Sequence, residues 1–159
     1  MFILVVILLF YEWWFLTKIL RIKPNIIISE SFLNQAEITL SKIQRSIEEG
    51  DYLWASVKIY YSAYYSLTAF LWRVGLKSEN HDCAIKITAY VLNDTEIEKT
   101  LDNLKSSRID NQYYLKISDA SVLKENYEAA KLLYAKFYNL LHNSNNNKFT
   151  QKIDNLFKN

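Results

Sequence analysis

Residues that form tight turns are scarce in this sequence, which has 2 glycines and 1 proline among 159 residues. Two-residue hairpin turns depend strongly on glycine, and glycine and proline are the clearest signals of turns between short elements. Leucine, isoleucine, lysine, glutamate and asparagine dominate the sequence instead. We therefore expect an all-α protein, in which strands are not expected.

Cysteine occurs once, as Cys83, which excludes an internal disulfide. A thiol-poor chain of this kind is typical of a reducing compartment, so we expect a cytoplasmic location. The sequence lacks the glycine-rich phosphate loop, the HExxH pair and the cysteine cluster of common nucleotide and metal sites, so neither a cofactor nor a metal is expected. The net charge of +2 is too small by itself to indicate a nucleic-acid or membrane partner.

One continuous apolar run is present, MFILVVILLF at residues 1–10, and apolar side chains continue to Leu20. A membrane-spanning helix needs about 20 apolar residues, and Glu12 interrupts this stretch at a cost of about 2.5–3.5 kcal/mol. The basic start and the cleavage site of a signal peptide are missing. We expect an extra apolar N-terminal helix that packs on the protein or at an oligomer interface, and a membrane is not the expected partner. The alternative is membrane association through Met1 to Leu20, which the basic residues at 18, 21 and 23 would suit.

The longest helix-compatible segment, Asp51 to Leu76, is apolar on nearly every face. After Asp51 its only charged side chains are Lys58 and Arg73. A helix that is apolar all round belongs at the centre of a bundle, with neighbours on several sides. We expect Asp51 to cap this helix and Gly75 to end it in a left-handed conformation.

Apolar residues spaced three and four apart predict amphipathic helices on both sides of this central segment. One follows a connection at 22–28 and ends at Gly50, and the others run to about residue 92, from 94 to 108, and from 119 to 141. The expected N-caps are Ser29 or Ser31, Ser78 or Asn80, Asp94, and Ser118 or Asp119. The pattern predicts an antiparallel bundle of about five helices, with an apolar leader at 1–28, the bundle at 29–142, and a polar linker with a short amphipathic tail at 143–159.

An inward-facing arginine is predicted near the end of the helix that starts at Asp94. The apolar stripe of this helix is formed by Ile97, Leu101 and Leu104, and the next position four residues on is Arg108. An unpaired cation on a buried face is costly. We therefore expect Arg108 to have a partner there, which is either a protein group or a ligand.

Three segments resemble one known family. The segment YLWASVKIYYSAYYSLTAFLWRVGLKSENHDC, at 52–83, resembles the second helix and following loop of small HEPN domain proteins. The segment RIDNQYYL, at 108–115, is similar to the Arg-x-Asp-x-Gln-Tyr motif of a prokaryotic, largely archaeal HEPN subgroup, and YEWWFLTKILRIKPN, at 11–25, resembles its leader. If the leader belongs to a soluble fold, only residues 1–10 are extra, and ten residues are too few to span a bilayer.

The resemblance implies a HEPN-like helical bundle, a homodimer, and a role in a toxin–antitoxin-type pair with a minimal nucleotidyltransferase as the partner. HEPN domain proteins that cleave RNA carry an arginine followed by a histidine, which together supply a cation and an acid–base group without a metal. Arg108 stands at the position of that arginine, but Tyr113 stands where the histidine is expected. Tyrosine has an unperturbed pKa of about 10 and is a poor base at neutral pH, unless Arg108 lowers that pKa and Asp110 orients the pair.

On this resemblance the catalytic candidates are Arg108, Tyr113 and Tyr114, and the candidates for binding RNA or a nucleotide are Arg108, Asp110, Asn111, Gln112 and His81. The four tyrosines at 60, 61, 64 and 65 of the central helix are the expected neighbours of the arginine. A single histidine in a loop is usually structural, so His81 is expected to cap the next helix or to approach Arg108 in space.

Three interpretations of Arg108 stay open at the level of sequence. In the first, Arg108 pairs with Asp110 or a carbonyl group and the neighbouring tyrosines pack at a dimer contact, so that the protein is a noncatalytic dimerisation or scaffold module. In the second, the site binds RNA or a nucleotide without cutting it, because arginine and aromatic rings suit phosphates and bases. In the third, the protein is a metal-free ribonuclease in which Tyr113 or Tyr114 takes a catalytic role.

Overall fold

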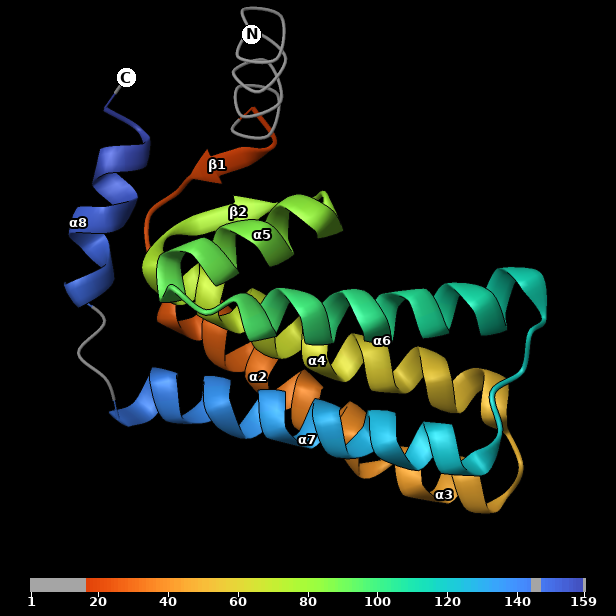
Figure 1. The fold of residues 1–159 in the computed structure, drawn as a ribbon. Coiled ribbons are helices and arrows are strands. Elements are labelled where there is room, and N and C mark those ends of the chain that lie inside the picture. Colours follow the sequence, from red (N-terminus) through yellow and green to blue (C-terminus); the bar gives the residue numbers. More distant parts are fainter. Residues whose placement is uncertain (1–16, 144–146, 159) are drawn as a thin grey trace, which may run out of the picture.

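The computed structural model describes residues 17–143 and 147–158. Its elements, in chain order, are β1 (Ile19–Arg21), α2 (Ile26–Ser41), α3 (Ile43–Glu48), α4 (Tyr52–Val74), β2 (Leu76–Ser78), α5 (His81–Leu92), α6 (Thr95–Tyr114), α7 (Ala120–Asn143) and α8 (Asn147–Leu156). The long helices run side by side along the molecule, and α5, α8 and the two short strands lie toward one end (Figure 1). The predicted all-α antiparallel bundle is confirmed.

Helix α4 is the centre of the bundle, as its all-round apolar sequence predicts. It packs against α2, α6 and α7, and its largest fully buried side chains include Tyr60 and Phe70. Asp51 occupies the N-cap position, where its side chain makes no capping hydrogen bond, while its carbonyl oxygen accepts the N–H of Ala55 at 2.9 Å. Gly75 ends the helix with φ +79°, in the left-handed conformation that was predicted.

Two three-residue strands form an antiparallel ribbon, with Ile19 opposite Ser78 and Arg21 opposite Leu76. The prediction of no strands is therefore wrong at this place. After the left-handed turn at Gly75 the chain is extended, and the Ile22 N–H donates to the Gly75 carbonyl at 3.0 Å. The expected N-terminal helix falls mostly on residues 1–16, which lie outside the described residues, and its described part is β1.

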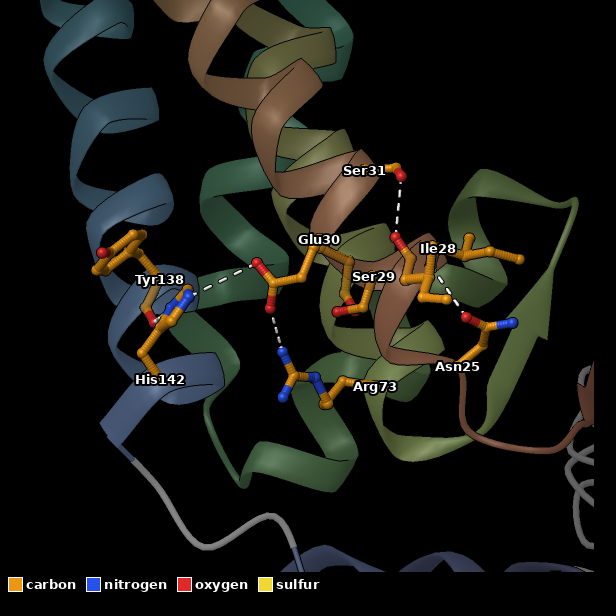
Figure 2. Close-up of polar contacts among 10 residues, drawn as sticks. Asn25, Ile28, Ser29, Glu30, Ser31, Arg73, Tyr138 and His142 are labelled. Carbon is orange, nitrogen blue, oxygen red and sulfur yellow. Dashed lines mark hydrogen bonds and ion pairs between the residues drawn. The ribbon is translucent and has the colours of Figure 1, made fainter.

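Helix α2 begins at Ile26, earlier than expected, because Asn25 is its N-cap (Figure 2). The Asn25 side-chain oxygen accepts the Ile28 N–H at 3.0 Å. The two predicted caps are inside the helix, where the Ser29 hydroxyl donates to the Ala69 carbonyl at 2.8 Å and the Ser31 hydroxyl donates to the Ile27 carbonyl at 2.9 Å. The prediction of Ser29 or Ser31 as the cap is wrong, because an asparagine directly before the helix takes that role.

The other predicted ends are mostly where the sequence places them. Asn80 caps α5 by accepting the Cys83 N–H at 2.9 Å, and Asp94 caps α6 by accepting the Glu96 N–H at 3.1 Å. Asp119 accepts backbone N–H groups at the start of α7. Two helices differ from the expectation: the one predicted to end at Gly50 is divided into α2 and α3, and α6 continues past residue 108 to Tyr114.

Glu30 joins three helices at one point (Figure 2). Its carboxylate accepts a hydrogen bond from Arg73 of α4 and lies 3.6 Å from Nε2 of His142 on α7. The His142 Nδ1 donates to the Tyr138 carbonyl at 2.9 Å, and the two rings stack 4.3 Å apart. This contact holds the start of α2 against the end of α4 and the last turn of α7.

Helix α8 packs into the same core as the bundle. Ile153 is fully buried, and the Phe149 ring meets the Phe70 ring of α4 edge to face at 5.4 Å. The Arg21 guanidinium of β1 donates to the Asp154 carboxylate at 2.8 Å. Within 17–143 and 147–158, no helix combines the length and the apolar character that crossing a bilayer requires.

Candidate functional site

The site is centred on Arg108, which lies on α6 one turn after Leu104 and is 9% exposed. Its guanidinium carbon lies 5.0 Å from the centre of the Tyr60 ring and 5.6 Å from that of Tyr61, both on α4. One terminal nitrogen donates to the Gln112 side-chain oxygen at 3.2 Å. The arginine predicted to face inward therefore does so, and it rests on the aromatic surface of the central helix.

The Arg108 cation is not neutralised by a carboxylate within the part of the chain that the structure describes. The ion pairs formed among those residues do not include it, and its buried Nε has no hydrogen-bond partner there. Aromatic faces attract a cation, by about 0.5–2 kcal/mol each. They do not supply the acceptor that a buried N–H group needs, so the Nε–H of Arg108 is left without one among the described residues.

His81, the first residue of α5, lies beside the arginine. Its Nδ1 is 2.6 Å from the phenolic oxygen of Tyr60, and its ring stacks on the Tyr64 ring with centroids 3.9 Å apart. The Tyr60 ring that carries the guanidinium thus also holds the imidazole through its hydroxyl group. His81 and Arg108 share one neighbour, because the Tyr60 ring lies 5.8 Å from the imidazole, measured between ring centroids, and 5.0 Å from the guanidinium carbon.

The protonation of this cluster follows from burial and from the nearby cations. Burial lowers the pKa of His81 below its usual 6.5, and the charges of Arg108 and Lys105 lower that pKa further, against the opposing effect of Asp82. The imidazole is therefore neutral at pH 7. Burial raises the pKa of the Tyr60 phenol well above its usual value and raises the pKa of Tyr64 to about 12, so both hydroxyls keep their protons.

The sequence did not indicate an ion pair that borders the site. The Lys105 ammonium group, one turn before Arg108 on α6, donates to the carboxylate of Asp82, which directly follows His81 on α5. This pair fixes the start of α5 against α6 and so sets the distance between the histidine and the arginine. In the sequence, the only sign of this ion pair is the position of its two members: Asp82 directly follows His81, and Lys105 lies three residues before Arg108.

Of the other candidate residues on α6, Tyr113 lies beside Arg108, whereas Tyr114 and Asp110 contact Lys116. Tyr113 lies beside the arginine, with its ring centre 5.8 Å from the guanidinium carbon, and is 66% exposed. Tyr114 is equally exposed and lies under the ammonium group of Lys116 instead, at 5.6 Å. Asp110 forms a 3.6 Å ion pair with Lys116 and none with Arg108, so the Arg108–Asp110 pair that the first interpretation allowed is not formed.

Asn111 is fully buried and is used within the fold. Its amide nitrogen donates to the Ser107 carbonyl at 2.7 Å and to the Ser118 hydroxyl at 2.9 Å. Its side-chain oxygen accepts the Ser118 N–H at 2.8 Å. The structure thus places Asn111 at the base of the α6–α7 connection, and it does not bring this amide to Arg108.

Two of the four tyrosines predicted to surround the arginine contact it. Tyr60 and Tyr61 lie under the guanidinium. Tyr64 supports His81, and Tyr65 lies against the rings of Tyr61 and Phe32, at 5.7 and 6.1 Å. In the described ranges, no group of three or more histidine, cysteine, aspartate or glutamate side chains is arranged to hold a metal ion.

Comparison with known proteins gives one match. A family model described as HEPN domain matches residues 29–143. This range includes α4, α5 and α6, and with them Tyr60, His81 and Arg108. Neither the curated proteins nor the solved structures contain a match to this chain.

Proposed function

Because the chain belongs to the HEPN domain family, we propose that it binds a backbone phosphate of RNA at Arg108 and cleaves the RNA there without a metal ion. The proposal rests on the surroundings of the Arg108 side chain. Arg108 is 9% exposed, and its guanidinium rests on tyrosine rings and lacks a carboxylate partner within residues 17–143 and 147–158. A phosphate would supply the charge and the acceptor oxygens that such a group requires.

His81 supplies the base that the α6 motif lacks in sequence. Tyr113 occupies the motif position where a histidine is expected, whereas the imidazole of His81, on α5, lies against the same Tyr60 ring as the guanidinium of Arg108. A neutral imidazole is the form that accepts a proton. When its Nδ1–H donates to the Tyr60 phenolic oxygen, the lone pair of Nε2 is available.

The reaction that these groups support is attack by the 2′-hydroxyl of RNA on the adjacent phosphorus. Nε2 of His81 takes the hydroxyl proton, the 2′-oxygen forms a bond to phosphorus, and the bond from phosphorus to the 5′-oxygen breaks. The leaving 5′-oxygen receives a proton from the hydroxyl of Tyr113, an exposed residue beside Arg108, and water then returns the proton of His81 to Tyr113. The products are a 2′,3′-cyclic phosphate and a 5′-hydroxyl end, and Arg108 stabilises the charge on the phosphoryl oxygens.

Two variants separate binding from cleavage. Arg108→Gln should weaken binding of a labelled single-stranded RNA by about tenfold or more and should abolish cleavage, because a charge-assisted phosphate contact is lost. His81→Gln should retain RNA binding and lose cleavage by about 100-fold or more. Arg45→Gln is the matched control, because Arg45 is an exposed arginine on α3 whose ion pair is with Glu49.

The measurements are fluorescence anisotropy for binding and gel analysis of the ends for cleavage, in the presence of EDTA. A DNA strand of the same sequence cannot be cleaved by this route, since it has no 2′-hydroxyl group. Equal RNA binding by the parent protein and Arg108→Gln would refute the proposal. Binding that depends on Arg108 without any cleavage would leave a noncatalytic RNA-binding site.

An exposed apolar patch favours a second proposal, association with another protein. Tyr113, Tyr114 and Leu115 are consecutive and at least 66% exposed, and Ile117 and Val122 continue the patch. We propose that a second copy of the chain covers this patch, which would place two Arg108 sites near one another. A minimal nucleotidyltransferase is the partner that the family resemblance suggests, and co-purification of the two proteins tests it.

Leu115→Asn tests the homodimer. Leu115 has φ +53°, a conformation that asparagine tolerates better than leucine, so the substitution removes apolar surface without harming the fold. Light scattering should show that the parent protein is a dimer. The Leu115→Asn dimer should dissociate at a higher protein concentration than the parent dimer does. A similar substitution at the exposed Leu132 of α7 should leave the mass unchanged, and a monomeric parent protein at micromolar concentration would contradict the proposal.

A further inference from the structure

The central helix α4 has one stripe that its neighbours do not fully cover. Between Trp54 and Trp72, the residues of α4 that are exposed or half-buried recur at helical spacing, so they lie on one side of the helix. The other residues of this segment are buried. We call this side the open stripe of α4, and its members are Trp54, Val57, Lys58, Tyr61, Tyr65, Thr68 and Trp72.

A row of aromatic rings lies along the open stripe and ends at the arginine of the site. The Tyr65 ring lies 5.7 Å from the Tyr61 ring and 6.1 Å from the Phe32 ring of α2, measured between ring centroids. These neighbouring rings are tilted by 38° and 40° to each other, so they do not form parallel stacks that would cover their faces. At the other end of the row, the guanidinium carbon of Arg108 lies 5.6 Å from the centre of the Tyr61 ring.

The surface around this row carries no acid on the open stripe or on the adjoining side of α2. The single charged residue of the open stripe is Lys58, a cation. The acids of α2, Glu30 and Glu37, contact side chains of α7 instead. Phe32 shares its side of α2 with uncharged residues, which are Ile28, Gln35 and Thr39. The row is thus aromatic and neutral to positive, with a cation at its end.

We propose that the open stripe binds the unpaired bases of the RNA strand whose phosphate lies at Arg108, an inference that rests on the proposed function. Aromatic side chains stack on the planar faces of bases, and cations take the phosphates of the same strand. With one phosphate at Arg108, the adjacent bases lie on Tyr61 and Tyr65, and the next base lies on Phe32. The ligand is therefore single-stranded RNA, because the bases of a duplex are already stacked on one another.

The charge of the surface favours RNA over a second copy of the chain on the open stripe. In a two-fold dimer the same surface is used by both protomers. A dimer formed through the open stripe would therefore bring Lys58 and Arg108 of both protomers to a surface without acids to pair with them. A polyanion meets no such mismatch.

Fluorescence anisotropy of the full-length protein with two labelled strands tests the proposal. One strand is an unstructured RNA, and the other is an abasic strand of the same length, which keeps the riboses and phosphates and lacks the bases. The parent protein should bind the RNA more tightly by about tenfold or more, because each stacked base contributes. Tyr65→Leu, which removes the ring and keeps apolar bulk, should weaken binding of the RNA by about fivefold to 100-fold and leave binding of the abasic strand unchanged.

Phe32→Leu should have the same selective effect, because it removes the last ring of the row. Tyr90→Leu is the matched control, because Tyr90 is a 50% exposed tyrosine on α5 whose ring lies 4.4 Å from the ammonium group of Lys152. This control should bind both strands as the parent protein does.

The outcomes separate this inference from the proposed function. If the parent protein binds neither strand, both fail. If it binds both strands equally and the binding depends on Arg108, the proposed function stands and the inference is overturned. The inference is also overturned if Tyr65→Leu weakens binding of both strands equally, since Tyr65 is then structural, or if Tyr65→Leu converts a dimer into a monomer, since a second copy then covers the open stripe.

Discussion

The phenolic oxygen of Tyr60 and Nδ1 of His81 are 2.6 Å apart, and this hydrogen bond joins the central helix to the first residue of α5. Tyr60 is fully buried, and its ring also lies under the Arg108 guanidinium. One side chain thus fixes the orientation of a neutral imidazole and the position of a cation. Such an arrangement is what a site for transfer at a phosphate requires, because the base and the cation must face the same group.

Tyr60→Phe tests whether this hydrogen bond positions His81. The ring under Arg108 is retained, so RNA binding should stay within about twofold of the parent protein. The cleavage rate at saturating RNA should fall by about tenfold to 100-fold, because the imidazole loses the group that fixes its tautomer. Single-turnover kinetics separate the two quantities. Equal loss of binding and of rate would indicate that Tyr60 has only a structural role.

Lys105→Gln tests the electrostatic control of His81. Lys105 lowers the pKa of His81, and Asp82, which pairs with Lys105, raises it. Removing the lysine charge should therefore raise that pKa toward its usual 6.5. NMR titration of the imidazole signals measures this shift, and His142→Gln assigns them because the chain has 2 histidines.

The same shift has a consequence for the pH dependence of cleavage. The base must be neutral, so the rate in the parent protein should rise with pH and reach its plateau through a pKa below 6.5. In Lys105→Gln this rise should move to higher pH. Lys99→Gln, on the exposed side of α6, is the control that should leave both the titration and the rate profile unchanged. Identical profiles for Lys105→Gln and the parent would contradict the assignment.

The two glycines provide a matched test of the connection between α4 and β2. Both have positive φ, +75° at Gly50 and +79° at Gly75. A Cβ atom at Gly75 would lie 2.6 Å from the Ile22 carbonyl oxygen and 3.0 Å from the Pro24 ring, whereas one at Gly50 meets nothing within 4 Å. Gly50→Ala should cost about 1–2 kcal/mol of stability, and Gly75→Ala more than about 3 kcal/mol. Urea denaturation measures the loss of stability in both variants. Equal losses would show that the chain at Ile22 and Pro24 does not pack tightly against Gly75.

Ile153→Ala tests whether α8 belongs to the core. Ile153 is fully buried, so its truncation should lower the free energy of unfolding by about 2–4 kcal/mol. Leu132→Ala, at a site 72% exposed on α7, should change it by less than about 0.5 kcal/mol. Thermal unfolding followed by circular dichroism gives both values. A negligible effect of Ile153→Ala would mean that α8 is not held in the core in solution.

Structural features that depend only on nearby residues in the chain could be predicted from the sequence. The caps at Asn80 and Asp94 and the stop at Gly75 depend on groups within a few positions. Asp94 and Gly75 were predicted, and Asn80 was one of two predicted caps. The inward position of Arg108 follows from helical spacing alone. The cap of α2 was missed because two serines close by offered the same chemistry as Asn25.

Features that depend on distant residues were not accessible in the same way. The pairing of β1 with β2 joins Arg21 to Leu76, and nothing in either short segment indicates the other. The Tyr60–His81 hydrogen bond and the Lys105–Asp82 ion pair each require two helices to be packed first. Asn111 was assigned to RNA because it lies in the motif, and only the fold shows that Ser118 uses its amide.

The contact between Arg21 and Asp154 bears on how the protein should be divided for study. The residues that match the HEPN model, 29–143, contain neither partner of this ion pair, and they exclude Ile153 and the chain that crosses Gly75. The buried core thus extends beyond the matched residues, since it includes Ile19 and Ile153. A fragment trimmed to the matched residues would leave Phe70 of the central helix without its edge-to-face neighbour and Gly75 without the chain that covers it, and we expect it to aggregate.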